Sequence, residues 1–284
     1  MNTIRCSMLP AWDDCARRTG GRQFAALLEK RGHRMRDLLP SVGSAIGTAV
    51  HRGAAHLLIA RVASAQEPSE HECMEAAEAS LVDALKPGAV WDATTPNMQT
   101  ALAQLHRMLG VYLPWLHGVT PLVVEERLRA GVTDGWELSG HCDLLTATHH
   151  LDDLKTGNIP RSYGAQLGGY ILDLEANGYT PRKASMTYVA RVRLRSKGGS
   201  AKAQPGPVRT EYDILEAKRS AWTAIRDIVR SVNAFERTGD PHELRANPMS
   251  LMCSPKYCAA WGTQFCRQHR GATPDQGLEQ META

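Results

Sequence analysis

Apolar residues in the first hundred positions recur with the spacing of α-helices. Residues 44–65 contain few strong helix breakers, and Ile46, Val50 and Ala54 fall on one face of such a helix. The same spacing predicts three more helices, at residues 22–31, 70–86 and 96–110. The N-terminal part of the chain is therefore expected to be mainly helical.

The two-residue alternation typical of β-strands replaces the helical spacing after Pro121. Three strands are predicted in succession, at residues 122–130, 136–148 and 149–156, with T-D-G forming the first turn. Short turns between consecutive strands favour antiparallel pairing, so the pattern indicates a three-stranded meander.

Helical spacing returns at residues 161–177, and Gly178 is expected to end that helix. A strand is predicted at residues 183–195 and a long amphipathic helix at 214–236. The loop between them, residues 196–207, is basic and rich in glycine and proline. This order of elements predicts the α/β class, with a mixed central sheet flanked by helices.

The predicted elements divide the chain into three parts of one integrated domain. A helical N-terminal part spans residues 1–115, and the central sheet with its helices spans 116–240. The remaining residues, 241–284, form a cysteine-rich segment and a polar tail. A chain of 284 residues is long enough to bury a substantial core in a single unit of this kind.

Composition narrows the class of protein. Hydrophobic residues make up 43% of the chain and charged residues 22%, which is ordinary for a soluble globular protein. The formal charge of +3 permits a polyanionic partner but does not require one. No apolar run approaches the roughly 18 residues of a membrane span. The first residues lack a signal-peptide pattern, so a cytoplasmic location is expected.

Two aspartates and a lysine form the candidate reaction centre. Asp143 and Asp153 lie near the ends of adjacent predicted strands, and a tight hairpin around 146–149 would bring them together. Lys155 is two residues beyond Asp153, so both side chains point to one face of the strand. Paired carboxylates suit Mg²⁺, which activates water and stabilises charge on phosphoryl groups. The alternative is a solvated strand end.

Neighbouring residues add to this centre. Gln166 and Tyr170 are four positions apart on the following helix and therefore share a face. His51, on the helix at 44–65, could supply a nitrogen ligand. Asp152 points to the opposite face of the strand from Asp153, and we expect it to be dispensable for the chemistry.

Four segments in this order resemble the PD-(D/E)xK nuclease superfamily, and most of all its RecB-like exonuclease branch. They are G-T-A-V-H-R-G, S-G-H-C-D-L-L, L-D-D-L-K-T-G and Y-G-A-Q-L-G-G-Y. The resemblance covers roughly residues 44–195 and implies a restriction-endonuclease-like core of helix, three-stranded meander, helix and strand. One departure is that Cys142, not proline, precedes the aspartate of strand two.

The resemblance implies a role for each of these residues. His51, Asp143 and Asp153 match the metal ligands, and Lys155 matches the lysine that positions the attacking water. Gln166 and Tyr170 match the Q-x-x-x-Y motif, which supports the site and contacts DNA.

The implied function is that of a DNA exonuclease that depends on Mg²⁺ or Mn²⁺. Linear DNA ends would be the substrate, in phage or bacterial recombination or repair. A single-strand annealing protein and further copies of the chain are the implied partners. Two alternatives remain open, namely a DNA-binding or assembly protein of the same fold that does not cut, and a CRISPR-type spacer-processing nuclease.

Basic residues at the end of the predicted strand at 183–195, and in the loop that follows, offer a candidate DNA contact. Arg191, Arg193 and Arg195 alternate along the chain, and Lys197 and Lys202 follow in the loop. Alternation would place the three arginines on one positively charged face that binds phosphates. The alternative is a solvated edge strand.

Three cysteines lie within fourteen residues near the C-terminus, namely Cys253, Cys258 and Cys266. Cysteines of a cytoplasmic protein rarely form disulfides. The resemblance implies a structural [4Fe–4S] cluster held by these three residues and Cys15. Zinc bound by the three cysteines and His269 is an alternative, and cysteines without metal are another.

Overall fold

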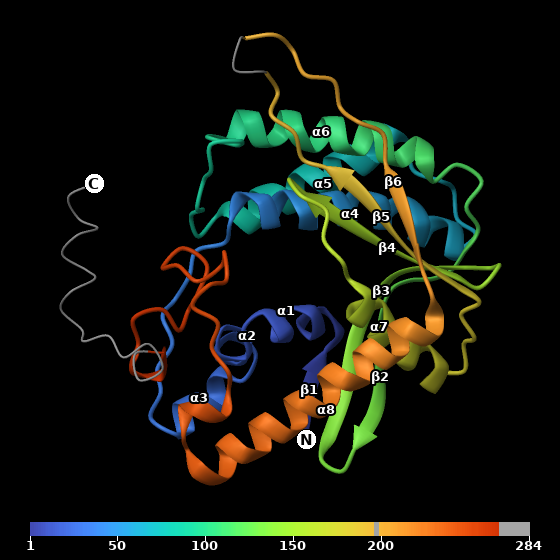
Figure 1. Cartoon of the computed structure of the whole chain (residues 1–284). Helices are drawn as coiled ribbons and strands as arrows, with labels where there is room; N and C mark the ends of the chain where they lie inside the picture. Colours follow the sequence, from blue (N-terminus) through green and yellow to red (C-terminus); the bar gives the residue numbers. More distant parts are fainter. Residues whose placement is uncertain (196–198, 267–284) are drawn as a thin grey trace.

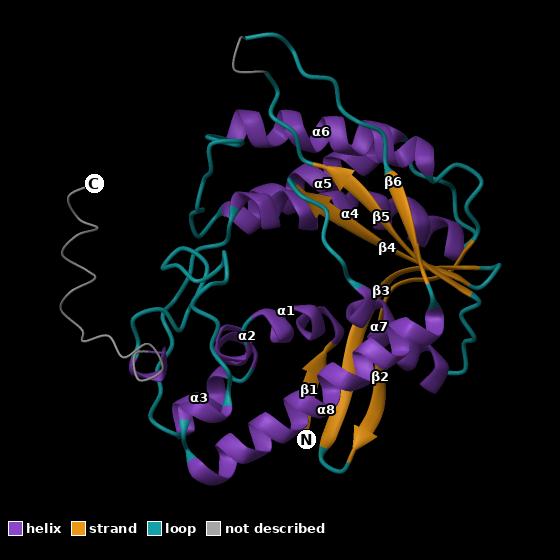
Figure 2. Ribbon diagram, viewed as in Figure 1, coloured by secondary structure: helices purple, strands orange, loops and turns teal. Residues whose placement is uncertain are grey.

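The computed structural model describes residues 1–195 and 199–266. Within these ranges, one mixed sheet of six strands carries helices on both faces (Figures 1 and 2). The strands are β1 (Asn2–Arg5), β2 (Pro121–Thr133), β3 (Trp136–Thr146), β4 (His150–Gly157), β5 (Lys183–Ala190) and β6 (Val208–Tyr212). The helices are α1 (Leu9–Asp14), α2 (Ala16–Gln23), α3 (Ala25–Lys30), α4 (Val42–Val62), α5 (Glu70–Leu85), α6 (Met98–Trp115), α7 (Gly164–Ala176) and α8 (Ile214–Thr238). None of these helices has both the length and the hydrophobicity needed to span a bilayer.

Strand β3 organises the sheet. It pairs antiparallel with β2 along nearly its whole length. Its first residues pair in parallel with β1, and its last residues pair antiparallel with β4. The sheet then continues through β5, parallel to β4, and β6, antiparallel to β5. The meander predicted from the alternation after Pro121 is therefore confirmed.

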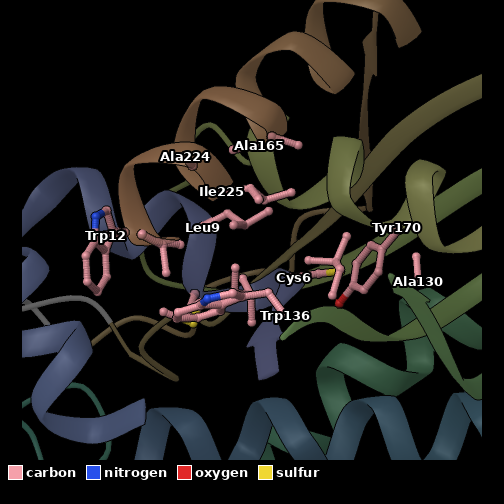
Figure 3. Packing of buried hydrophobic residues seen from close by; sticks show 14 of the residues in the cluster. Cys6, Leu9, Trp12, Ala130, Trp136, Ala165, Tyr170, Ala224 and Ile225 are labelled. Atoms are coloured by element: carbon pink, nitrogen blue, oxygen red, sulfur yellow. The ribbon is translucent and has the colours of Figure 1, made fainter. Parts of the chain in front are cut away.

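Two hydrophobic clusters cover the sheet. Helices α4, α5 and α6 pack over Leu144, Leu154 and Val189 in one cluster. Helices α1, α7 and α8 form the other cluster, together with the N-terminal strand and part of the cysteine-rich segment. Figure 3 shows Trp12, Trp136 and Ile225 of this second cluster packed between the helices and the sheet. The sheet thus carries a separate core on each side.

Helices α7 and α8 approach each other closely at a glycine. A Cβ atom on Gly168 would lie 1.9 Å from the carbonyl oxygen of Ala217, so a larger residue does not fit there. Helix α8 buries a stripe that includes Ile225, Ile228 and Val232. It ends at Gly239, whose φ of 69° is the left-handed conformation that glycine adopts without strain.

The predicted long helices at 44–65, 70–86 and 214–236 are confirmed as α4, α5 and α8. The helix predicted at 22–31 is instead split between α2 and α3, with Phe24 at the junction, and the helix predicted at 96–110 continues to Trp115. The N-terminal part also contributes β1, a strand too short for its alternation to be recognised. Strand β6 was missed as well, because it follows the basic loop directly.

The strand predicted at 183–195 was too long, since β5 ends at Ala190. Its next residue, Arg191, has a buried side chain that pairs with Asp92 at 2.7 Å and also bonds to Thr95. Because Arg191 is held by these two partners, the chain leaves the strand at this residue. The alternation expected of a strand therefore does not continue to the later arginines.

Candidate metal and catalytic site

The hairpin between β3 and β4 sets the positions of the two aspartates. Leu144 pairs with Asp152 and Leu145 with Leu151. In this register Asp143 and Asp153 are the next opposite pair, and the described backbone ladder ends before them. The amide of Leu154 donates instead to Asp143 Oδ2 at 2.8 Å. The strands therefore separate where the carboxylates lie, and one carboxylate bonds the released backbone group.

The alternation of buried residues changes phase at Asp143. Cys142 and Leu145 both belong to the cluster under α7 and α8, although regular alternation places residues three positions apart on opposite faces, whereas Leu144 belongs to the cluster under α4. Glu125 lies opposite Asp143 on β2 and has a φ of 49°, which is unusual for a residue with a side chain. Such a conformation costs about 1–3 kcal/mol and is typical of functional positions.

His51 of α4 brings these two carboxylates into one group. Its Nδ1 lies 3.2 Å from Asp143 Oδ1 and 3.6 Å from Glu125 Oε1. One ligand atom from each residue lies within 4.8 Å of the other two. Burial alone would lower the pKa of His51, but the Asp143 carboxylate and the hydrogen bond to Glu125 raise it to about 10. A divalent cation would take the place of this proton between the same atoms.

Asp153 and Lys155 form a buried ion pair beside this group. Lys155 Nζ lies 2.5 Å from Asp153 Oδ2 and 5.0 Å from the ring centroid of Tyr163. Asp153 is fully buried, and neither of its oxygens accepts a well-aligned hydrogen bond from a described residue. Burial raises the pKa of Asp153 to about 7. A buried carboxylate with unused lone pairs suits a metal ligand.

Gln166 and Tyr170 contact each other, as their spacing predicts. The Gln166 amide donates to the Tyr170 hydroxyl at 2.8 Å, and both side chains are buried. A Cβ atom on Gly140 would lie 2.6 Å from the Tyr170 ring, so this glycine lets the ring pack on β3. Burial raises the pKa of Tyr170, which keeps its hydroxyl neutral. The pair braces the strand that carries Asp143.

Glu125 is the site residue that the sequence interpretation missed. The only signal was the pair Glu125–Glu126 on the strand next to Asp143. Regular alternation assigns adjacent residues to opposite faces but cannot reveal the left-handed residue that turns Glu125 toward His51. The candidate ligand group is therefore His51, Glu125 and Asp143, with the Asp153–Lys155 pair adjacent.

Asp152 lies on the opposite face from Asp153, as predicted, but it is not a solvated residue. Its carboxylate accepts hydrogen bonds from Ser185 at 2.5 Å and from Thr187 at 2.7 Å. Arg209 adds an ion pair at 3.1 Å. Asp152 is 3% exposed, so it holds β5 and β6 to β4 from within the sheet. Its role is structural.

The proposed basic face is only partly present. Arg191 is buried and paired with Asp92, so it is not available to a phosphate. Arg193, Arg195 and Lys202 are exposed. Lys197 lies outside the described residues. The prediction that the three arginines share one face is therefore wrong for Arg191.

All four predicted cysteines lie around one pocket. Cys15, Cys253, Cys258 and Cys266 line one small pocket. Cys15 caps the N-terminus of α2, and its sulfur accepts from the amides of Arg18 at 3.4 Å and Asn247 at 3.5 Å. The pocket thus joins the first helices to the C-terminal segment. His269, the alternative zinc ligand, lies outside the described residues.

One family of known proteins matches most of the chain. The family model of the PD-(D/E)XK nuclease superfamily matches residues 21–266. No curated protein matches the sequence. A solved structure described as "Crystal Structure of LHK-Exo in complex with dAMP" is 12% identical, with a TM-score of 0.30, covering 67% of this chain and 95% of that one. A second, "Crystal structure of SSO0001", is 14% identical, with a TM-score of 0.27, covering 72% and 85%.

Proposed function

The chain belongs to the PD-(D/E)XK nuclease superfamily, and from this membership we propose that it is a Mg²⁺- or Mn²⁺-dependent deoxyribonuclease that degrades linear DNA from its ends. The observation that carries the proposal is the compact group of His51, Glu125 and Asp143 beside a buried carboxylate–lysine pair. The described residues thus supply both parts that the reaction needs, a group of metal ligands and a lysine that orients water.

The residues divide the work between holding an ion and positioning water. His51, Glu125 and Asp143 would hold the cation, and Asp153 offers a further oxygen that accepts no well-aligned hydrogen bond from the described residues. The ion, when bound, lowers the pKa of its water and stabilises charge on phosphoryl oxygens. Lys155, held by Asp153, orients the water that attacks phosphorus. Gln166 and Tyr170 keep the strand of Asp143 in position.

Cleavage of labelled DNA tests the catalytic proposal. Purified protein is mixed with end-labelled linear duplex, closed circular duplex or single-stranded DNA, with Mg²⁺, Mn²⁺ or a chelator. We expect linear DNA to be degraded and circular DNA to survive. Lys155→Ala and Asp143→Ala should lose cleavage, whereas Lys86→Ala, at an exposed lysine that follows the last residue of α5, should keep it.

Three other results would change this assignment. Cutting of circular DNA would indicate an endonuclease. Binding of DNA without cutting by the wild type would identify a protein of the same fold that has lost catalysis. Release of short fragments of uniform length would favour a spacer-processing nuclease. For an exonuclease that degrades linear DNA, we propose a role in phage or bacterial recombination or repair and a cytoplasmic location.

We further propose that Cys15, Cys253, Cys258 and Cys266 hold a structural [4Fe–4S] cluster. Tetrahedral zinc, with Zn–S bonds of about 2.3 Å, needs sulfurs roughly 4 Å apart. Among the described residues, no three cysteine sulfurs lie within 4.8 Å of one another. The choice of a cluster over a single ion rests on the family resemblance and on the four cysteines that line one pocket, since four thiolates are the ligand set of such a cluster.

Metal content tests the cluster. The protein is purified without oxygen and analysed for iron, sulfide and zinc, with an absorbance scan. We expect iron and sulfide in wild-type protein and their loss in Cys258→Ser. Cys73→Ser, a buried cysteine in the other core, is the control and should keep the iron. A colourless protein without iron would contradict the proposal.

A further inference from the structure

A fully buried arginine adjoins the four-cysteine pocket. Arg17 is 0% exposed and lines the pocket together with the four cysteines. Its Nε donates to the carbonyl oxygen of Leu244 at 3.0 Å and its Nη1 to that of Phe265 at 2.7 Å. Its Nη2 donates to the carbonyl oxygen of Pro241. Its guanidinium lies 5.2 Å from the ring centroid of Phe265. The charged group is thus hydrogen-bonded on every side but surrounded by neutral partners.

No described carboxylate forms an ion pair with Arg17. Asp240 acts on it only through space, and that exposed carboxylate pairs with His242 at 2.9 Å. Burying a charge without a counter-charge costs several kcal/mol, on the order of the whole stability margin of a domain. Carbonyl dipoles satisfy the hydrogen-bonding groups but leave the net charge in place. A neighbouring anionic group would offset this cost.

The pocket offers such a group only when its cysteines are thiolates. A cluster held by four thiolates carries net negative charge, and adding an electron makes it more negative. Hydrogen bonds to the sulfurs and nearby positive charge both favour the more negative state. Two backbone amides already bond to the sulfur of Cys15, at the positive end of α2.

We propose that Arg17 is the buried counter-charge of the four-cysteine centre and raises its reduction potential. This inference rests on the cluster proposed above. Arg17 acts through the cysteines and the carbonyl groups of the C-terminal segment, so it is a positioning and tuning residue rather than a catalytic one. The same side chain ties three carbonyls of that segment to α2, so the charge role must be separated from a purely structural one.

Three variants make this separation. Arg17→Gln removes the charge but keeps two donors, and Arg17→Lys keeps the charge but loses the planar arrangement of donors. Arg18→Gln is the matched control. Arg18 lines the same pocket, but its charge is already neutralised by Asp14 at 2.6 Å. Each protein is purified without oxygen, analysed for iron and sulfide, and titrated with dithionite to obtain the midpoint potential of the one-electron reduction.

We expect Arg17→Gln to shift the midpoint potential to more negative values, and more than Arg18→Gln does. Arg17→Lys should stay near the wild-type potential, although its melting temperature should fall. Equal potentials in wild type and Arg17→Gln would overturn the proposal. If Arg17→Gln does not fold, Arg17→Lys decides, because a large negative shift with the charge still present contradicts the charge role.

The same measurements distinguish a failure of the Arg17 proposal from a failure of the nuclease or cluster proposal. Nuclease activity is measured separately, and its absence would leave the potentials interpretable. Protein without iron in every preparation, or with zinc in its place, would overturn both the cluster and the role of Arg17. Iron present with a potential indifferent to the charge would overturn the role of Arg17 alone.

Discussion

At the scale of single residues, neighbouring acids in one strand have opposite tasks. Asp152 is fixed by three donors inside the sheet, whereas Asp153 accepts no aligned hydrogen bond from a described residue and pairs only with Lys155. Both are buried, so exposure alone does not distinguish a ligand from a structural acid. The distinction lies in whether the lone pairs of each carboxylate are already used.

This difference predicts opposite effects of the same substitution. Asp152→Asn should lower the free energy of unfolding by about 1–3 kcal/mol, because one amide group cannot accept all three hydrogen bonds. The folded enzyme should keep most of its turnover. Asp153→Asn should lose about 10- to 100-fold in activity. Urea unfolding and DNA cleavage assays on both variants measure the two effects. A loss of turnover in folded Asp152→Asn would contradict this division.

Asp173 predicts a pH dependence of stability away from the metal group. Burial raises its pKa to about 7, and the Cys6 thiol is its hydrogen-bond donor at 3.3 Å. The unfolded chain releases this proton near pH ~4. Between these values the unfolded state binds fewer protons, so the contribution of Asp173 to stability is present below the unfolded pKa and is lost as pH rises.

Asp173→Asn should remove this dependence. The stability of wild type relative to the variant should fall by at most about 1.4 kcal/mol per pH unit between about pH 5 and pH 7. Urea unfolding at several pH values measures the difference. Asp83→Asn, at an exposed position on α5, is the control and should show no such trend. A difference that stays constant with pH would show that Asp173 is ionised in the folded protein.

At the scale of elements, the close contact of α7 and α8 at a glycine predicts the cost of adding a side chain there. Gly168→Ala should lower the free energy of unfolding by about 3 kcal/mol, because its Cβ would overlap the Ala217 carbonyl group between α7 and α8. Gly110→Ala is the matched control on α6, where nothing lies within 4 Å of the new Cβ. It should raise stability by about 0.5–1 kcal/mol. Thermal unfolding of both variants measures these changes in stability. Equal effects would mean that α8 can move away from α7 without cost.

The order of elements was predictable because each has a strong local pattern. The meander, α4, α5 and α8 follow from periodicity, and the opposite positions of Asp143 and Asp153 follow from the register of a tight hairpin. Glu125 was not predictable, since its place depends on a left-handed residue and a phase change in the sheet. The end of β5 depends on the pairing of Arg191 with Asp92, which are 99 residues apart. Local patterns carry no record of such distant partners.

At the scale of the whole molecule, the four-cysteine pocket joins segments from both ends of the described chain. Cys15 contributes from the N-cap of α2 and the other three cysteines from residues after 250. Ser250 also accepts from Arg18 at 3.0 Å and donates to Asp14 at 2.7 Å. A metal centre there would add its binding free energy to that of folding.

Removal of the centre should therefore lower stability without altering the nuclease residues. Cys258→Ser should lower the melting temperature by on the order of 5 °C or more, whereas Cys73→Ser should have a smaller effect. Cleavage at low temperature should persist in folded Cys258→Ser, because the candidate ligand His51 lines a different pocket from the four cysteines. Calorimetry and cleavage assays on the same preparations check both statements. If iron is lost but the melting temperature is unchanged, the metal centre does not contribute to the stability of the fold.

The contacts of the first residues have a consequence for synthesis. β1 pairs with β3, and Arg17 donates to the carbonyl group of Phe265, which is 248 positions away. At about 5–20 residues per second, this last partner leaves the ribosome on the order of 10–50 s after Arg17. Early in that time Ile4, Leu9 and Trp12, all fully buried in the finished protein, lack most of their packing partners, which lie in β2, β3 and the elements that follow. The N-terminal segment should therefore complete its core only after the sheet and the helices that follow it have been synthesised.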